Sequence, residues 1–578
     1  MRYSRSRRPL IRLATASVVG ALLLSACSTP DAVVHSPRPN SPTATASPSA
    51  NPETDPAKLQ IPLNSLPDWT PPTPLGDGKY SRPFADGTVT WQLFNGENQP
   101  IVNYQPAGPV GFGDSSTYTT IPGVLTFRGN NYRNAPTYGS ADVSARRLQV
   151  AWTRETGDVH AEGSYWAGAG WTGQPLLVNW PQATKQAMGL DAAYTNDPNF
   201  VEVVYPVVDG HVYRLDLASG RDTKPPIDVG FAFKGTGSID PRGYPLLYAG
   251  MGLNENGDKK GEWRYRIFDL IQNKEVSGWN GSDPVAPRDW GAFDSSALIN
   301  AASDTLIEPA ENGLIYKVKL NAQFDAAAKT VSVTPEFTKL NYDTGQQNLR
   351  HGIESSAAAY RNLMFAGDND GHLICWDATT MQIVWVLPVE DDSDATVVLE
   401  DTPDGPFLYT GNELDKRGEA GQASGPVQFR KVNALTGEVV WTWQIDARYD
   451  KAVNGGLMAT PALGFGEVSD LIFVTMAKTA SAKQGTLVAL DKKTGAVVWQ
   501  RTMHAFSWSS PVLVQGDDGH VYGVQGDSSG LLHLFNPNTG VDYSTLQLDQ
   551  NIEATPAVYG NMLVVGTYAK KLYGVRIS

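Results

Sequence analysis

The feature that most constrains this chain is a hairpin that ends in tryptophan and recurs along its second half. Copies lie at 371–385, 432–441 and 489–499, and each joins two apolar strands through a turn that opens on Asp or Asn and contains Thr. Alternating apolar residues predict the strands, and Asp, Asn, Thr and Gly supply the turn chemistry. One such hairpin cannot bury its own apolar faces, so successive copies must pack on one another.

The repeats recur roughly every 40–65 residues, and four strands fit in each interval. This spacing predicts an all-β chain that forms an eight-bladed β-propeller of four-stranded antiparallel blades. The last unit is one strand short, and the strand at 148–153 is predicted to complete it, which would remove an open sheet edge. The predicted first strands begin near Gln174, Asp240, Ser295, Ser355, Ala395, Thr460, Ser510 and Thr555.

Composition narrows the class of protein. The 578 residues include 56 Gly and 39 Pro, and only 18% are charged, which suits many turns and excludes a coiled coil, collagen or a wholly disordered chain. The net charge is −14, and no basic stripe is present, so nucleic acid is not an expected partner.

The N-terminus reads as a secretory signal. Residues 1–12 carry five Arg, an apolar run follows at 13–24, and small residues precede Cys27. Leu24–Cys27 resembles a bacterial lipobox, which implies a signal peptide over 1–26 and lipidation of Cys27. Residues 27–60 contain seven Pro with many Ser and Thr, which predicts a disordered tether that cannot form a core. We therefore expect an extracytoplasmic protein that is lipid-anchored to the cell membrane, or to an outer membrane if one exists.

The stretch Ala489–Trp499 resembles the tryptophan-docking motif of PQQ-like propellers. That family includes PQQ-dependent alcohol dehydrogenases and the lipoprotein of the outer-membrane β-barrel assembly machine, and residues 126–136 resemble its opening segment. The resemblance implies a PQQ-like propeller over 141–578, preceded at 61–140 by an extension with a hairpin. The tryptophans expected to dock on neighbouring blades are Trp152, Trp385, Trp441 and Trp499.

Catalytic motifs are weak. Gly526–Gly530 matches G-x-S-x-G, but a strand and not a helix follows it, so a hairpin turn is the better interpretation. The eight His residues form no zinc motif, and the cysteines Cys27 and Cys375 stand alone. We expect no catalytic residue and no metal site.

Charged and aromatic residues gather just before the first strands of several units. Because these connections surround the central channel of a propeller, their side chains are expected to converge on one rim and form a binding face. The alternative is an ordinary solvated channel mouth. The candidates are Trp166, Trp171, Arg288, Trp290, Asp294, Arg350, His351, Glu354, His504 and Trp508, with Asp240, Asp394 and Glu553 on the same predicted rim.

Two functions remain open. The first is a non-catalytic scaffold, monomeric and without a cofactor, that binds an envelope protein or polymer. The second is a PQQ-dependent dehydrogenase with Ca²⁺. The family resemblance implies that such an enzyme covers PQQ with adjacent cysteines, and this chain has none.

Overall fold

The computed structural model describes residues 34–35, 52–171, 173–345, 350–451 and 454–578. All of them belong to one compact unit, Val33–Ser578. The predicted lipidation site Cys27, the signal peptide and most of the predicted tether lie outside the described residues.

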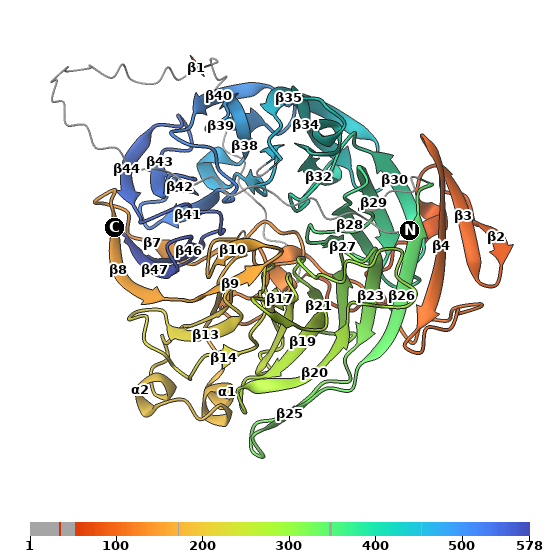
Figure 1. Cartoon of the computed structure of the whole chain (residues 1–578), viewed down its shortest axis with the longest axis horizontal. Coiled ribbons are helices and arrows are strands. Elements are labelled where there is room, and N and C mark those ends of the chain that lie inside the picture. Colours follow the sequence, from red (N-terminus) through yellow and green to blue (C-terminus); the bar gives the residue numbers. More distant parts are fainter. Residues whose placement is uncertain (1–33, 36–51, 172, 346–349, 452–453) are drawn as a thin grey trace. The chain divides into compact units, whose positions relative to one another are not determined.

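Seven blades are each built from one continuous stretch of chain and follow one another around a ring (Figure 1). Their core strands are β11 (Leu176–Val178), β12 (Glu202–Pro206), β13 (His211–Asp216) and β14 (Ile227–Asp228); β15 (Ser238–Ile239), β16 (Leu246–Gly250), β19 (Arg264–Asp269) and β20 (Lys274–Asn280); β21 (Leu298–Asn300), β22 (Thr305–Pro309), β23 (Leu314–Lys319) and β26 (Glu336–Asp343); β27 (Ala358–Tyr360), β28 (Leu363–Gly367), β29 (His372–Asp377) and β30 (Ile383–Pro388); β31 (Val398–Thr402), β32 (Gly405–Gly411), β34 (Ser424–Asn433) and β35 (Val439–Arg448); β37 (Ala462–Leu463), β38 (Leu471–Ser481), β39 (Gln484–Asp491) and β40 (Val497–Thr502); and β41 (Val512–Gly516), β42 (Val521–Gly526), β43 (Leu531–Phe535) and β44 (Asp542–Gln547).

A composite sheet closes the ring. The last three strands of the chain, β45 (Ala557–Tyr559), β46 (Met562–Thr567) and β47 (Lys571–Ile577), are joined by β8 (Leu148–Glu155). The strand β8 pairs antiparallel with β47, with Leu148 opposite Ile577. The strand that precedes the first blade and the last strand of the sequence therefore meet in one sheet.

The prediction of eight four-stranded antiparallel blades is wrong. Seven blades are continuous, and only three of these are plain four-stranded sheets, because further strands join the others. Two of the added strands, β6 (Thr137–Tyr138) and β7 (Ser140–Ala141), pair in parallel with β45 and β41. The sequence repeat could not reveal these additions, because short strands from the N-terminal segment carry no copy of the repeat.

Neighbouring blades are joined by tryptophan. The indole N–H of Trp499 donates to the carbonyl of Pro537 at 2.9 Å, and the ring covers Gly540 in the turn of the next blade. Gly540 has a positive φ of 75°, and a Cβ there would meet the ring at 2.6 Å. The turn glycine thus serves both the backbone conformation and the docking of the preceding blade. Trp152, Trp385 and Trp441 contact Gly220, Gly437 and Gly495 in the same way and donate to the carbonyls of Leu217, Ala434 and Lys492.

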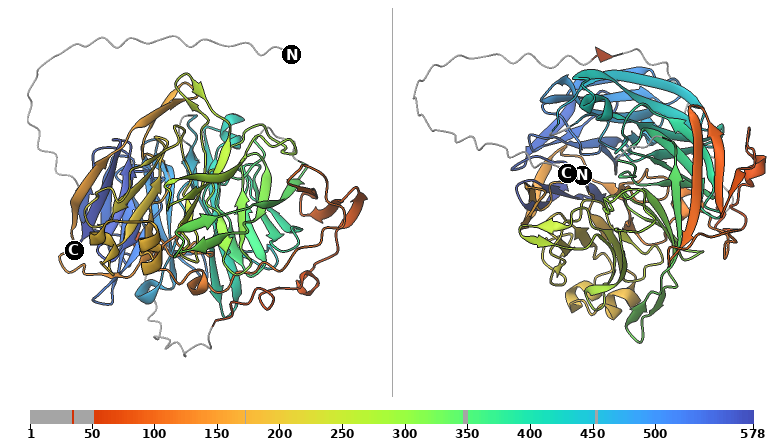
Figure 2. Two further views of the ribbon diagram at one scale, coloured as in Figure 1. Left: turned by 90° about the horizontal axis from the view of Figure 1, so that it is seen from below. Right: turned by 45° about the vertical axis from the view of Figure 1, so that its right-hand side comes forward.

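The N-terminal extension widens one blade. Strands β2 (Thr73–Gly76), β3 (Lys79–Phe84) and β4 (Gly87–Asn95) continue the sheet outward from β26 (Figure 2). The predicted hairpin of this extension is formed by β3 and β4, and beyond the end of β4 the backbone N–H of Ile101 donates to the carbonyl of Leu93. Packing begins inside the predicted tether, because Leu59 is buried and the Gln60 side chain donates to the carbonyl of Val110.

Residues 123–141, named here the crossing segment, run across the inner strands. The segment begins with β5 (Gly123–Val124), which pairs with β11, and ends with β6 and β7. Between them, backbone carbonyls of Leu125, Asn131 and Tyr132 accept hydrogen bonds from Ile239, Ala359 and Leu399. One segment therefore ties together the inner strands of most of the ring.

The remaining elements are short. None of the helices among the described residues is long and apolar enough to cross a membrane. They are α1 (Gln182–Ala187), α2 (Ala192–Thr195), α3 (Lys416–Glu419), η1 (Leu63–Ser65), η2 (Ser115–Thr117) and η3 (Gly466–Val468), with strands β1 (Val34–His35), β9 (Asp158–Ala161), β10 (Ser164–Ala167), β17 (Glu255–Asn256), β18 (Lys259–Lys260), β24 (Gln323–Asp325), β25 (Thr330–Ser332), β33 (Glu413–Leu414) and β36 (Gly455–Gly456).

Candidate functional site at the channel mouth

A belt of Ser and Thr hydroxyls joins the inner strands around the channel. The backbone N–H of Ser356 donates to the hydroxyl of Thr396 at 3.0 Å, Thr396 donates to Thr460, and Thr460 donates to Ser510. At five junctions a hydroxyl thus accepts a hydrogen bond from a buried backbone N–H of the neighbouring blade. The members of this hydroxyl belt are Thr236, Ser296, Ser356, Thr396, Thr460, Ser510 and Thr555.

The residue two positions before each belt hydroxyl forms the channel mouth. Since the inner strands repeat in register, these residues lie on one side of the belt. Four of them, Asp294, Glu354, Asp394 and Met458, line one cavity whose wall also includes Phe127 of the crossing segment. The complete set is Lys234, Asp294, Glu354, Asp394, Met458, Trp508 and Glu553.

Lys234 is the basic residue at this position and lies among acids. Its ammonium forms an ion pair with Asp294 and lies over the Trp171 ring at 4.9 Å. Burial alone would lower its pKa, but Asp294, Glu311 and Glu354 raise the pKa of Lys234 above its ordinary value. The pKa of Glu311 is raised well above its usual range by burial and by the nearby carboxylates. The single positive charge of Lys234 is therefore shared among three neighbouring carboxyl groups.

A second acidic group adjoins the first. Oxygens of Asp392, Asp394 and Glu413 lie within 4.8 Å of one another. Burial and mutual repulsion raise the pKa of all three carboxyl groups well above their ordinary values. The channel mouth as a whole carries more carboxyl groups than bases, and this imbalance sets its chemistry.

Aromatic rings flank the acids. Trp171 lies 5.4 Å from Trp166 and 6.0 Å from Trp508, measured between ring centroids, and Trp290 lies 4.7 Å from Trp263. Trp166, Trp171 and Trp290 also pack against one small apolar cluster. The candidate tryptophans of the binding face are thus neighbours, and they present indole edges and faces beside the carboxylates.

The other candidates lie further out. Arg288 lies 3.7 Å from a carboxylate oxygen of Glu311, and Arg350 forms ion pairs with Asp415 and Glu419. His504 is exposed on the loop that leads to Trp508.

Two acids of the predicted rim differ from their neighbours there. Asp240 lies beyond the belt, where it pairs with Arg242 at 2.6 Å and does not face the cavity. Glu553 is at the mouth position, accepts a hydrogen bond from Tyr568 at 2.7 Å, and has its pKa raised by burial to about 8.

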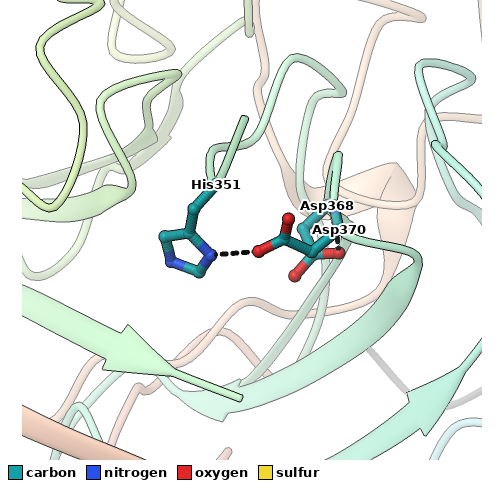
Figure 3. A group of neighbouring side chains, drawn as sticks. All are labelled: His351, Asp368 and Asp370. Atoms are coloured by element: carbon teal, nitrogen blue, oxygen red, sulfur yellow. Dashed lines mark hydrogen bonds and ion pairs between the residues drawn. The ribbon is translucent and has the colours of Figure 1, made fainter. Parts of the chain in front are cut away.

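His351 belongs to a buried network behind the rim (Figure 3). Its Nδ1 lies 2.6 Å from a carboxylate oxygen of Asp370, and Asp368 is beside them. Burial would lower the pKa of His351, but the hydrogen bond to Asp370 raises it. Asn369 donates to Glu354 at 3.1 Å, so this turn also positions a residue of the mouth.

Sequence reasoning missed Lys234, Glu311, Asp392 and Glu413. Lys234 had a usable signal, because it precedes Thr236 by the same two positions that separate Asp294 from Ser296. Glu311 follows β22 and Glu413 follows β32, so their arrival at the mouth depends on how each blade turns back. No spacing in the sequence predicts that Glu311 and Glu413 lie at the channel mouth.

The mouth does not fit PQQ. The cofactor is an anion, and here it would meet carboxylates whose nearby bases are already paired. Cys375, the only cysteine among the described residues, is fully buried in β29 and cannot cover a ligand in the channel. The residues present suit a cation better than an anion.

Comparison with known proteins bears on the fold. The sequence model of the family described as outer membrane protein assembly factor BamB matches residues 324–505 and 483–577. These matches lie in the C-terminal part of the chain, and there the propeller resembles that family. The propeller is similar to the quinohemoprotein alcohol dehydrogenase of Comamonas testosteroni, with a TM-score of 0.50 and 13% identity over 79% of this chain and 80% of that one.

Two more solved structures resemble the propeller of this chain. The quinohemoprotein alcohol dehydrogenase ADHIIG of Pseudomonas putida has a TM-score of 0.51 and 11% identity, over 79% of this chain and 80% of that one. BamB of Moraxella catarrhalis has a TM-score of 0.44 and 14% identity, over 74% of this chain and 100% of that one. No curated protein matches the sequence. At these identities the likeness concerns the fold, and function must be argued from the site.

Proposed function

We propose that the protein is a lipid-anchored lipoprotein of the bacterial cell envelope whose propeller is a non-catalytic scaffold for a protein or polymer. The anchor rests on Leu24–Cys27, which resembles a lipobox. The envelope role is supported by the match to the assembly-factor family.

One observation carries the binding role. Acidic and aromatic groups from distant parts of the chain converge on one concave mouth, while the crossing segment packs on the other side of the hydroxyl belt. A concavity with convergent polar groups is the usual form of a binding site. Since the mouth has an excess of carboxyl groups, complementary charge favours a basic segment of the partner.

The alternative is a PQQ-dependent dehydrogenase. Likeness to two quinohemoprotein enzymes supports it only through the fold. The charge of the mouth opposes an anionic cofactor. We expect protein incubated with Ca²⁺ and PQQ to show no quinone absorbance after desalting and no dye reduction with alcohols; a stoichiometric quinone band with turnover would establish the enzyme instead.

The scaffold is tested by site-specific crosslinking in cells. A photocrosslinker at His504 should give discrete adducts, whereas one at Val541, which is 51% exposed on the outer edge of a blade, should not. Equal labelling at both positions, or none at His504, would contradict the scaffold. The anchor is tested separately: Cys27→Ser should move the protein from the membrane fraction to the soluble fraction.

A further inference from the structure

We propose that Asp392, Asp394 and Glu413 form a binding site for a divalent cation, with Ca²⁺ as its ion. The three residues come from two segments, the loop before β31 and the short strand β33. The backbone N–H of Glu413 donates to the carbonyl of Asp392 at 3.0 Å, which holds the segments together. One carboxylate oxygen from each residue lies within 4.8 Å of the others.

Neighbouring acids show what is unusual about these three. Glu390 pairs with Arg430, Asp391 pairs with Arg417 at 2.8 Å, and Asp415 pairs with Arg350. These surrounding acids thus each have an arginine.

By contrast, no ion pair joins Asp392, Asp394 or Glu413 to a basic side chain among the residues that the structure describes. Lys234 acts on Asp394 and Arg350 acts on Asp392 only at longer range, so no base directly neutralises these three adjacent carboxyl groups.

Unpartnered oxygens support a ligand independently of the charge. Glu413 is only 1% exposed, yet its Oε2 has no hydrogen-bond partner among the described residues, and neither has Oδ1 of Asp394. A buried polar atom without a partner costs free energy, and buried polar atoms without one are rare in folded proteins. A cation bound between these oxygens would satisfy them and remove the repulsion.

The donor set selects the ion. All three side chains offer oxygen, and the group contains neither a nitrogen nor a sulfur ligand, so hard cations are preferred over zinc or copper. Ca²⁺ accepts six to eight oxygen ligands in flexible geometry. Three carboxylates can supply at least three of these oxygens, and water can complete the coordination shell. Asp394 also lines the cavity of the channel mouth, which gives the ion a route from solvent.

The test uses the full-length protein after removal of metal with EDTA. Calorimetric titration with CaCl₂ near pH 7 should show one site per chain, and Ca²⁺ should raise the melting temperature. Glu413→Gln should weaken Ca²⁺ binding at least tenfold. Because this change removes repulsion, the variant should melt in EDTA at or above the temperature of the wild type, which shows that it folds; Asp392→Asn is the second variant, with the same expectation.

Glu311→Gln is the matched control. Glu311 belongs to the neighbouring group with Asp294 and Glu354, where Lys234 and Arg288 supply positive charge. This variant should keep the affinity of the wild type. The proposal is overturned if millimolar CaCl₂ gives neither heat nor a melting shift, as expected if protons alone neutralise the site. It is also overturned if Glu413→Gln binds normally, or if Glu311→Gln removes the binding.

Discussion

The two sides of the hydroxyl belt both bury charged side chains, but they differ in whether those side chains have hydrogen-bond partners. On one side, the crossing segment buries Arg128 and Arg133 completely. The Arg133 guanidinium donates to the carbonyls of Ala357, Phe127 and Ser296, and Arg128 donates to those of Pro461 and Pro511. On the other side, the channel mouth buries carboxyl groups whose oxygens lack donors.

The difference separates structure from binding. The donors of these buried cations are directed at carbonyls and at the Thr126 hydroxyl and not at a ligand site, so the crossing segment is a structural element. The mouth keeps unused acceptors at a cost in stability, and such a cost is typical of sites that bind something. Four substitutions test this contrast, from the largest expected effect to the smallest.

Arg133→Met should be the most damaging change. It removes charged donors from three buried carbonyls and from the Thr126 hydroxyl, and each such hydrogen bond contributes about 1.5–3 kcal/mol. We expect the free energy of unfolding in a denaturant titration to fall by at least about 3 kcal/mol. Arg147→Met, at an exposed position, is the control. Similar stability in both variants would mean that the crossing segment does not hold the ring together.

Glu553→Gln should change how stability depends on pH. The pKa of Glu553 is raised from 4.5 to about 8 by burial, so the folded protein holds this proton over a range where the unfolded chain releases it. Its contribution is fully present below about pH 4.5 and is lost as the pH rises toward 8. The loss has a limit of about 1.4 kcal/mol per pH unit.

The glutamine variant should flatten that part of the pH profile, measured as the free energy of unfolding from pH 5 to 8. The Tyr568 hydroxyl can accept from the new amide, so the local hydrogen bonding is retained. An unchanged slope would show that Glu553 is not buried as an acid, and it would weaken the contrast between the two sides.

Thr460→Val tests the belt itself. The side chain keeps its shape but no longer accepts the hydrogen bond from the buried N–H of Thr396, which costs about 1–3 kcal/mol. Thr436→Val, in an outer turn where the hydroxyl accepts from Glu438, is the matched control and should cost less. If thermal melts place the two variants together, the belt contributes little to joining the blades.

Asp294→Asn should have the smallest effect. Removing one partner of a buried ion pair usually costs about 3–5 kcal/mol. Here Glu311 and Glu354 remain close enough to act on Lys234, so the acid excess should compensate and the loss should stay below about 1 kcal/mol. A loss as large as that of Arg133→Met would show that the mouth is built as tightly as the crossing segment.

The sequence predicted the blades better than their edges. Turn glycines and docking tryptophans mark four of the junctions between blades, because the glycine position must meet both demands, as Gly540 beneath Trp499 shows. The crossing segment carries no repeat, so its parallel strands β6 and β7 were not foreseen. A strand of two residues has no periodicity to detect.

The repeat also explains which of the predicted rim residues lie together at the channel mouth. Asp294, Glu354 and Asp394 precede inner strands in a constant register, so their common location follows from the repeat. Asp240 was misplaced because its inner strand β15 begins at Ser238, two residues earlier than expected. The apolar pattern at this point is too short to show where the strand begins.

The composite closing sheet has a consequence for biosynthesis. Ser578, the last residue, exchanges backbone hydrogen bonds with Arg147, at 2.7 and 3.0 Å, and Ile577 pairs with Leu148. A nascent chain can build its blades in order of synthesis, but the ring cannot close until β47 has been synthesised. Before β47 is in place, the edge of β8 that pairs with it has free backbone hydrogen-bonding groups, which can pair with another chain. Premature termination anywhere within β47 would leave that edge open permanently, even though every earlier blade is complete.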